Sequence, residues 1–270
     1  MKFKLIFAVF NIVILAFLFF VCFAPFFVFG SGIRPSFQRS VWPLALLLVL
    51  ILAALDVYYA LNYRLFSLLE REDWPALSAY LEEQVLRKGR YSNRLVKLLA
   101  TTYLVMSDIP AVVGLENRLA IGKPALVERN ALVFGAARIL GKDYAGAVRF
   151  FSSRIGGGGG WLNCYYGFAL LLDRKLKEAA EQFRLLAAGS ADPLISGLSA
   201  WFLADALRGR TGESYAEVTE KGRLRVRQSL KNRAAWDAEA GKLETDVHVA
   251  VLRKYIGEAG DWIFGSEQGR

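Results

Sequence analysis

The sequence predicts an all-α protein in which an N-terminal transmembrane helical hairpin precedes a set of repeated helical pairs. Three observations lead to this prediction. Two long apolar runs stand at the N-terminus. From Arg64 onward, apolar residues recur at three- and four-residue spacing, and no alternating Val/Ile-rich run is bounded by turns. A short motif that begins with Asp at residues 73, 108 and 143 recurs at a constant interval.

The composition divides the chain into a strongly apolar N-terminal part and a basic remainder. Of 270 residues 54% are hydrophobic, and the net charge is +9. These values exclude a uniformly soluble protein, a disordered chain and a small disulfide-stapled secreted domain. The part after residue 63 is long enough to bury a core of its own. We expect a hairpin over residues 1–63, helical repeats over 64–210, and basic and amphipathic capping helices over 211–270.

The first two elements are expected to be membrane spans over about residues 5–29 and 41–61. Only Asn11 and Pro25 interrupt the first run, and only Pro43 and Asp56 the second. A bilayer core of about 30 Å needs about 20 helical residues, so each run can cross once. A cleaved signal peptide plus one span is the alternative. The first run is too long for it and ends Pro-Phe-Phe-Val-Phe, without a small-x-small cleavage site.

The loop between the spans is short, so both chain ends are expected on the same side of the membrane. Four basic residues flank the outer ends of the spans, against two in the loop. This bias favours a cytoplasmic C-terminal domain, at the inner membrane if the cell is bacterial.

Asn11 and Asp56 are polar residues inside the predicted spans. In an antiparallel hairpin they fall at similar depth, where a hydrogen bond between them would offset part of the cost of burial. Contact with a partner subunit is a second explanation, and ion translocation a third.

Helical repeats are indicated by the recurring motif. Asp73-Trp-Pro-Ala-Leu returns as Asp108-Ile-Pro-Ala-Val and as Asp143-Tyr-Ala-Gly-Ala, and a looser copy begins at Lys175. Each Asp is placed to cap the first turn of a helix, in which proline is tolerated. Twelve residues before the last residue of each motif stand Leu65, Ala100, Gly135 and Gly167; the last three are small, as close helix packing requires.

This pattern resembles the tetratricopeptide repeat family, whose period is about 34 residues and whose repeat is a pair of antiparallel helices. The resemblance covers about Leu65–Leu207, with Leu65 and Glu116 departing from the family's pattern. It implies an α-solenoid of about four to five helical pairs. The stretch from Trp236 to Trp262 is expected to cap its open end.

A solenoid of this family presents its concave side as a protein-binding groove. The resemblance assigns to this groove Arg94, Lys97, Thr101, Arg129, Leu132, Ala136, Ile139, Trp161, Cys164, Phe168 and Leu171. The groove would be basic at one end and apolar-aromatic at the other, which suits a peptide or helix with acidic and hydrophobic anchors. The alternative for each position is packing against a neighbouring repeat.

No pattern in the sequence indicates an enzyme. His248 is the only histidine, and Cys22 and Cys164 have no metal-ligand spacing. Gly156–Gly160 is expected to be a flexible loop, since no Lys-Ser/Thr follows it as in a phosphate-binding loop. We therefore expect no catalytic residue, no metal and no cofactor.

Six basic residues gather between Lys221 and Arg233. On a helix, Arg223, Arg227 and Lys231 share one face. Lys221 belongs to the same cluster and is the fourth candidate contact residue. A solvated face of a capping helix is one explanation; an anionic lipid surface and an acidic protein are the others. Nucleic acid is disfavoured because aromatic residues are not interleaved with the charges.

Two function classes fit these features. The first is a membrane-anchored scaffold or adaptor, whose TPR-like groove recruits a protein partner that the sequence does not identify. The second is an integral subunit of a larger envelope machine for secretion, motility, transport or cell-wall assembly. In that case the hairpin itself contacts other membrane subunits.

Overall fold

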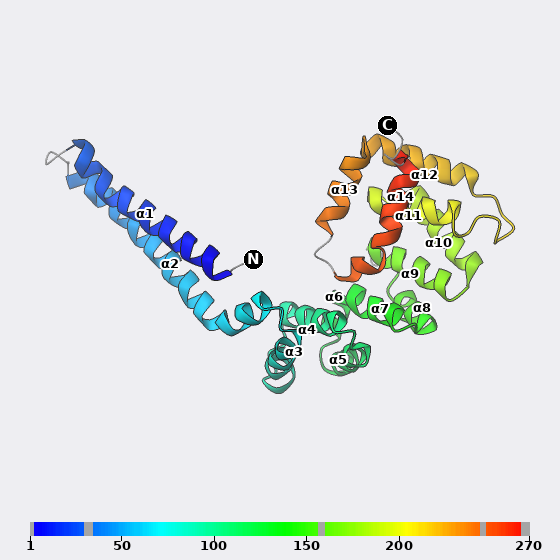
Figure 1. The fold of residues 1–270 in the computed structure, drawn as a ribbon, viewed down its shortest axis with the longest axis horizontal. Coiled ribbons are helices and arrows are strands. Elements are labelled where there is room, and N and C mark those ends of the chain that lie inside the picture. Colours follow the sequence, from blue (N-terminus) through cyan, green and yellow to red (C-terminus); the bar gives the residue numbers. More distant parts are fainter. Residues whose placement is uncertain (1–2, 30–34, 156–159, 244–246, 266–270) are drawn as a thin grey trace. The chain divides into compact units, whose positions relative to one another are not determined.

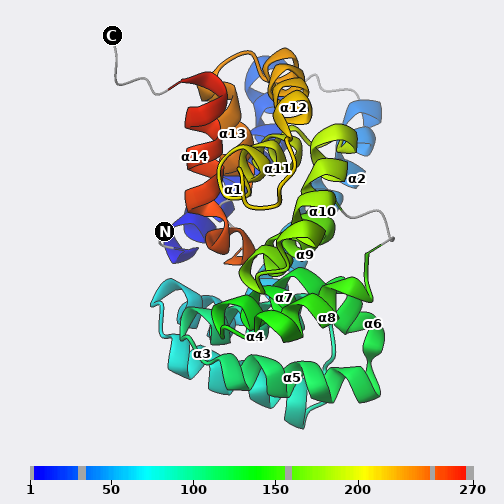
Figure 2. The same cartoon turned by 90° about the vertical axis from the view of Figure 1, so that its right-hand side faces the viewer.

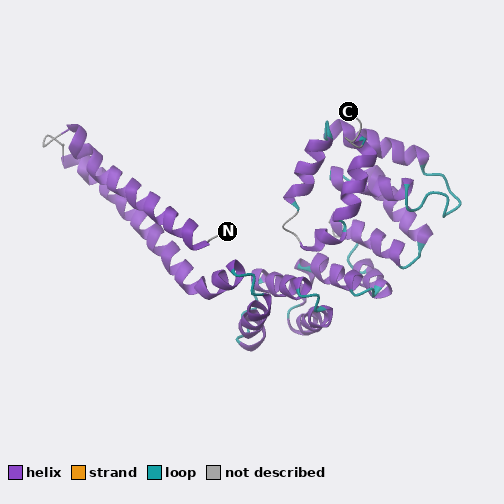
Figure 3. Ribbon diagram, viewed as in Figure 1, coloured by secondary structure: helices purple, strands orange, loops and turns teal. Residues whose placement is uncertain are grey.

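The computed structural model describes residues 3–29, 35–155, 160–243 and 247–265. Throughout these ranges the regular structure is helical and no strand is present, as Figure 3 shows. The prediction of an all-α protein is confirmed.

The chain forms two compact units, Met1–Gln84 and Val85–Arg270. The first contains α1 (Phe3–Phe29), α2 (Pro35–Glu70) and α3 (Trp74–Glu82), and the π-helix η2 (Glu83–Arg87) lies at the boundary. The second contains α4 (Asn93–Val105), α5 (Ile109–Gly122), α6 (Pro124–Arg129), α7 (Ala131–Leu140), α8 (Tyr144–Ser152), α9 (Gly160–Leu172), α10 (Leu176–Gly189), α11 (Pro193–Ala204), α12 (Ala216–Ser229), α13 (Arg233–Lys242), the 3₁₀-helix η3 (Val247–Val251) and α14 (Arg253–Phe264).

The helices α1 and α2 pack side by side and antiparallel (Figure 1). Over residues 7–20, the part of α1 whose side chains are described, the half-buried side chains are Phe7, Asn11, Ile14 and Leu18. Their spacing of four, three and four residues is that of a coiled-coil seam. The ring of Phe7 stacks on Tyr59 of α2, with 4.0 Å between centroids, which sets the register of the pair.

One helical segment among the described residues is long and apolar enough to cross a membrane: Leu46–Glu70, within α2. None of its apolar window is buried inside the protein, in contrast to the core helix of a soluble protein. In α1 the stretch whose side chains are described, Phe7–Phe20, is apolar throughout except for Asn11. The structure therefore supports one candidate span of the two that the sequence predicts.

The same turn follows four helices, α2, α4, α7 and α9. In each case the second residue after the helix has a positive φ between 54° and 61°, although none is glycine: Glu72, Ser107, Lys142 and Arg174. Its N–H and the next N–H bond back to two carbonyl oxygens of the preceding helix, as in Asp73 N to Leu68 O and Glu72 N to Leu69 O. This is the Schellman arrangement, which satisfies carbonyls at a helix end.

The residue after each turn starts the next helix. Asp73, Asp108 and Asp143 each accept a hydrogen bond at Oδ1 from the N–H three residues later, at 2.9–3.1 Å. The fourth copy has Lys175, whose backbone angles match those of the aspartates but whose side chain makes no cap. The predicted helix starts and their spacing are confirmed by these repeated turns.

In the second unit, small residues allow neighbouring helices to approach closely. A Cβ added to Gly135 of α7 would lie 2.0 Å from Phe151 Cζ of α8. One added to Gly167 of α9 would lie 3.0 Å from Phe183 Cε1 of α10. In both pairs the glycine stands 16 residues before the phenylalanine. The helix pairs α7–α8 and α9–α10 therefore repeat one packing arrangement.

The C-terminal elements cover one side of the helices that begin each pair. Figures 1 and 2 show α14 beside α11 and α13, and η3 packs on α7. Tyr255 of α14 lies 5.4–5.8 Å, between ring centroids, from Phe168, Trp201 and Phe202. Trp236 of α13 is fully buried and donates from Nε1 to the carbonyl oxygen of Ile256. These segments are integral to the core of the second unit, and do more than close the end of a stack.

Candidate functional site

A cavity of the second unit lies where α9, α10 and α11 come together. Its volume is about 750 Å³. Its apolar lining comprises Ile155, Trp161, Leu185, Leu186 and Ile195. Leu185 is 53% exposed, because it lies outside the buried face of α10. An apolar hollow with an exposed leucine at its side can receive an apolar side chain of another molecule.

A few polar groups surround this cavity. Asn163 and Gln182 contribute amides, and Gln182 Nε2 makes a long hydrogen bond, 3.4 Å, to the carbonyl oxygen of Asn163. Asp192 caps α11 by accepting from the N–H groups of Leu194 and Ile195. No lysine or arginine is among the residues that line the cavity. The lining thus combines apolar side chains with two amides and one carboxylate.

Of the predicted groove residues, Trp161 is the one that lines this cavity. Leu185 and Ile195 were not predicted. The signal for Leu185 was an apolar residue outside the three- and four-residue pattern of its helix. Ile195 carries no comparable signal, because a buried isoleucine after a capping aspartate is ordinary core.

The predicted groove is not a continuous surface in the structure. Arg94, Lys97 and Arg129 are exposed, and Thr101, Leu132 and Leu171 are half-buried. The remaining side chains other than Trp161 are buried: Ala136, Ile139, Cys164 and Phe168. At these four positions the alternative explanation holds: the side chains pack within the fold. The groove assignment is corrected there, since the chain's own α14 and η3 pack against these helices.

Burial also makes Cys164 unreactive. Its side chain is fully buried, and desolvation together with the nearby charge of Asp192 raises the pKa of its thiol to about 12. The thiolate that nucleophilic or metal-binding chemistry needs is therefore suppressed.

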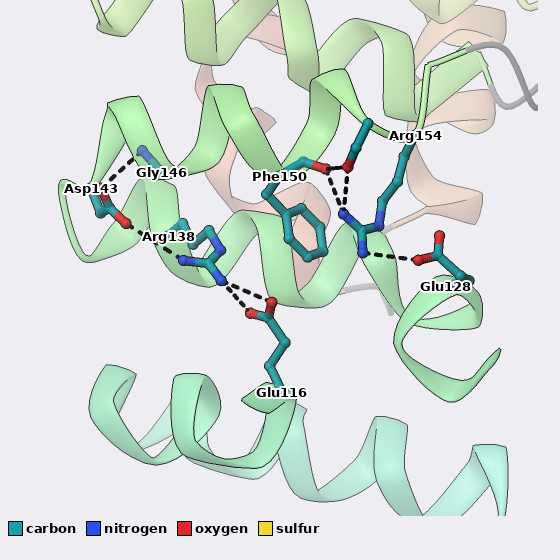
Figure 4. A network of polar contacts seen from close by, with 8 residues as sticks. Glu116, Glu128, Arg138, Asp143, Gly146, Phe150 and Arg154 are labelled. Carbon is teal, nitrogen blue, oxygen red and sulfur yellow. Dashed lines mark hydrogen bonds and ion pairs between the residues drawn. The ribbon is translucent and has the colours of Figure 1, made fainter. Parts of the chain in front are cut away.

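Glu116, which departs from the family's pattern, is the acidic partner of Arg138 from α7. Arg138 Nη2 lies 2.8 Å from both carboxylate oxygens of Glu116, as Figure 4 shows. The two side chains are 9% and 18% exposed. Arg138 Nη1 also lies 3.5 Å from Asp143, the aspartate that caps α8. A charged pair thus links α5, α7 and the start of α8.

Phe150 of α8 lies between two guanidinium groups (Figure 4). The Cζ of Arg154 is 3.9 Å from the centroid of the ring, and that of Arg138 is 5.3 Å away. Arg154 donates to the carbonyl oxygen of Phe150 at 2.7 Å and pairs with Glu128 of α6 at 2.8 Å. The cluster of Figure 4 joins four consecutive helices, and we assign it a structural role.

The basic cluster of α12 bonds to the ends of two other helices. Arg223 and Arg227 donate from Nε to the carbonyl oxygen of Ile263, near the end of α14. Arg225 donates to carbonyl oxygens of Ala187 and Ala188, near the end of α10. Cations stabilise helix C-termini, where the carbonyl dipoles concentrate. Lys221 pairs with Glu217, and Lys231 is exposed. The bonds to carbonyl oxygens give the three arginines a structural role, which the explanation as a solvated face did not include.

The predicted hydrogen bond between Asn11 and Asp56 is not formed. Asn11 donates from Nδ2 to the carbonyl oxygen of Phe7, while its Oδ1 is buried without a hydrogen-bond partner. Asp56 is exposed on α2. The stacking of Phe7 on Tyr59 does place the two residues at similar depth. The amide of Asn11 nevertheless bonds within its own helix.

The remaining predictions concern metal and nucleophile chemistry. Among the described residues no group of three His, Cys, Asp or Glu side chains could hold a metal ion. The side chains of Cys22 and His248, and the backbone of residues 156–159 in the glycine run, lie outside the described part of the chain. Gly160 is the first residue of α9.

Comparison with known proteins identifies relatives of unassigned function. A family described as "Uncharacterised Treponema protein" matches residues 111–265, which is more than half of the chain. A protein of Treponema pallidum (strain Nichols), described as an uncharacterized protein, is 27% identical over 248 residues. The alignment covers 87% of this chain and 78% of that protein. No solved structure matches. The matched region runs from α5, which contains Val112, to Phe264 at the end of α14, and includes the helices that line the cavity. The chain belongs to this Treponema family.

Proposed function

We propose that the protein is a membrane-anchored scaffold or adaptor that recruits a partner protein through the repeat domain. The observation that carries this proposal is the cavity between α9, α10 and α11, with Trp161 and the exposed Leu185 in its lining. The resemblance of the repeated helical pairs to tetratricopeptide repeats supports it, since that architecture serves protein binding.

The anchor of this scaffold is the helical hairpin. Leu46–Glu70 has the length and composition of a span. We propose that α1 crosses the bilayer beside it, because α1 is helical from Phe3 to Phe29 and packs against α2 along a coiled-coil seam. Both ends of the hairpin and the repeat domain then lie on the same side, and the bias of basic residues toward the outer span ends supports a cytoplasmic location for it.

The chemistry of the cavity specifies the partner in general terms. Its apolar side chains suit a leucine-sized or aromatic side chain, and the amides of Asn163 and Gln182 suit a hydrogen-bonding group next to that side chain. An exposed helix or an extended segment with one such anchor would satisfy both requirements.

Affinity capture of the detergent-solubilised full chain tests this function. A partner should co-purify reproducibly with the wild type and should be lost with Leu185→Asp and with Trp161→Ala. Leu224→Asp is the matched control, since Leu224 is 49% exposed on α12 and does not line the cavity. It should retain the partner. If the partner co-purifies with the Leu185→Asp variant in unchanged yield, the cavity is not the docking site.

A second candidate function is favoured by Asp56. This carboxylate lies within the candidate span, is exposed on α2, and does not bond to Asn11. Charged groups inside a bilayer normally contact another polar group of a protein. A subunit of a larger envelope machine, contacted through the hairpin, would provide that group.

The two candidates are separated by substitutions in the span. In a machine subunit, Asp56→Leu should release a co-purifying membrane protein, whereas Val57→Leu, at a neighbouring exposed position, should not. In a scaffold that uses the hairpin only as an anchor, Asp56→Leu should leave the set of partners unchanged, and only the cavity variants should alter it.

A further inference from the structure

The helix α2 presents two faces with the spacing of helix packing inside its candidate span. Over residues 46–64, the half-buried side chains on the face that packs on α1 are Leu48, Leu52, Tyr59 and Asn62. A second set recurs at four- and three-residue spacing and is exposed throughout: Val49, Ala53, Asp56, Ala60 and Tyr63. We call these five residues the second face. Because one residue turns a helix by about 100°, the second face lies about a quarter turn away from the one that α1 covers.

The centre of the second face differs from the rest of the exposed surface of the span. Positions that face lipid carry large apolar side chains, such as Leu50 and Leu61, which are 59% and 77% exposed. The second face instead has the small residues Ala53 and Ala60 on either side of Asp56. In membrane helices, small residues allow two backbones to approach closely, and a polar residue among them hydrogen-bonds to the neighbouring helix.

Asp56 is the group on the second face that lipid alone does not satisfy. It lies about 15 Å along the helix from Leu46, where the candidate span begins, and about 12 Å from Arg64, the next charged residue. No hydrogen bond or ion pair joins its carboxylate to the described part of the chain. A carboxyl group at this depth is costly unless another polar group of a protein meets it. The occupant of the second face must therefore supply a polar group at the depth of Asp56.

A second copy of the chain necessarily meets this requirement. Both copies cross the membrane in the same direction, so their Asp56 residues lie at the same depth. In a parallel pair with two-fold symmetry, each residue of the second face packs against its own counterpart. The alanines of the two copies then meet on either side of the carboxyl groups and let the backbones come close. Two carboxyl groups in contact hydrogen-bond to each other when they share a proton.

We propose that the second face of α2 is a contact between two copies of this protein, with the paired Asp56 carboxyl groups at its centre. The proposal deepens the second candidate function, in which the hairpin makes the contact, and it rests on α2 spanning the membrane. Two hairpins joined in this way form a four-helix bundle in which the two α2 helices are in contact. Each membrane complex then carries two repeat domains.

Disulfide crosslinking of the full chain in membranes tests which face makes the contact. Cys22 and Cys164 are replaced by alanine, one new cysteine is introduced, and the membranes are oxidised with copper phenanthroline in air. Ala53→Cys and Ala60→Cys should give a covalent dimer. Val57→Cys is the matched control, since Val57 is exposed one residue beyond Asp56 and outside the second face. It should remain a monomer.

Sedimentation equilibrium of the full chain in detergent measures the strength of the contact. Asp56→Leu should raise the dissociation constant of the dimer about three- to thirtyfold, the effect expected of losing an interhelical hydrogen bond. Asp56→Asn should retain the dimer, since amides can hydrogen-bond to each other across the pair. Ala53→Leu should weaken the dimer by separating the backbones. Ala54→Leu, at the neighbouring exposed alanine, should leave the dissociation constant unchanged.

Three results would overturn the proposal: equal crosslinking at positions 53 and 57, a dimer that Asp56→Leu does not weaken, or equal weakening by Ala53→Leu and Ala54→Leu. If the chain is a monomer and Asp56→Leu releases a different membrane protein, the second candidate function stands and the contact between copies is wrong. If the chain is a monomer and Asp56→Leu releases nothing, both are wrong. The cavity variants are absent from these experiments, so the scaffold function is judged separately.

Discussion

At the scale of single residues, packing at the repeated positions leaves little freedom. Gly135 faces the ring of Phe151, which is fully buried. Cys164 is held neutral by its apolar surroundings. Both positions were selected from the sequence, the glycine as a close helix contact and the cysteine as part of a groove. The first prediction is supported by the geometry, and the second is corrected by burial.

Gly135→Ala is expected to destabilise the repeat domain by about 1–3 kcal/mol, because the new Cβ would overlap the Phe151 ring. Gly114→Ala, on α5, is the matched control, since nothing lies within 4 Å of its added Cβ. The control should gain about 0.5–1 kcal/mol from the better helix propensity of alanine. Urea unfolding of the full chain in detergent measures both. Equal effects of the two substitutions would contradict the packing described here.

Cys164 predicts a pH dependence at the alkaline end. Because burial raises the pKa of its thiol from 9.0 to about 12, the neutral thiol favours the folded state. This contribution is fully present below pH 9, where the thiol is neutral in both states. It is lost between about pH 9 and pH 12, as the thiol ionises in the unfolded chain but not in the folded one.

The free energy of unfolding of the wild type, compared with that of Cys164→Ala, should therefore decline as the pH rises above 9. Chemical unfolding at pH 7, 9 and 10.5 gives this difference, and other titrating groups cancel in the comparison. A difference that stays constant over this range would show that the thiol is not desolvated.

At the scale of elements, charged side chains fasten helices that are distant in the sequence. Glu116 and Arg138 stand 22 residues apart, and Arg227 reaches Ile263 over 36 residues. The sequence identified Glu116 as a departure from the family's pattern, and the basic run of α12 as a cluster. The sequence could not identify the partner of Glu116 or of the basic run, because helical periodicity carries no information on which distant group a charged side chain contacts.

Glu116→Leu should destabilise the domain by about 3 kcal/mol, since it leaves the Arg138 guanidinium largely buried without its carboxylate. The double variant Glu116→Leu/Arg138→Met removes both charges and should recover most of that loss. Thermal unfolding of the single and double variants provides the test. A double variant as unstable as the single one would show that the pair is not the reason for the destabilisation.

Arg227→Ala should cost about 1 kcal/mol, because it removes a charge-assisted hydrogen bond at the C-terminal end of α14. Lys221→Ala on the same helix is the control. Its ion pair with Glu217 is exposed on both sides and screened by solvent, so its loss should shift the curve less than the loss of Arg227 does. Urea unfolding curves that shift equally for the two variants would argue that the cluster is only a solvated face.

At the scale of the whole molecule, the sequence predicts the kind of fold better than the surfaces it exposes. Helical periodicity, the capping aspartates and the small residues are local signals, and the structure confirms the helix starts they predict. The groove was carried over from a family in which the concave side is open. Here η3 and α14 occupy part of that side, because their apolar residues pack against α7 and α11.

The hairpin was likewise only partly predictable. Apolar length identifies a candidate span in α2, and polar residues in the runs suggested a contact between the helices. The stacking of Phe7 on Tyr59 gives a register in which Asn11 and Asp56 share a depth. Asn11 donates its hydrogen bond to the carbonyl oxygen of Phe7 and not to Asp56. Which of the two accepts depends on the direction of the Asn11 side chain, and spacing along the sequence does not specify that direction.

The central claim is that a repeat domain fixed to a membrane binds a partner at the cavity between α9, α10 and α11. Photocrosslinking tests it most directly: a benzoylphenylalanine at position 185 is activated in intact cells, and the membranes are then washed with alkaline carbonate. The account predicts a discrete crosslinked protein in the carbonate-resistant membrane pellet, absent when the crosslinker stands at position 224. A chain released by carbonate, or one without a crosslinked protein at position 185, would contradict it.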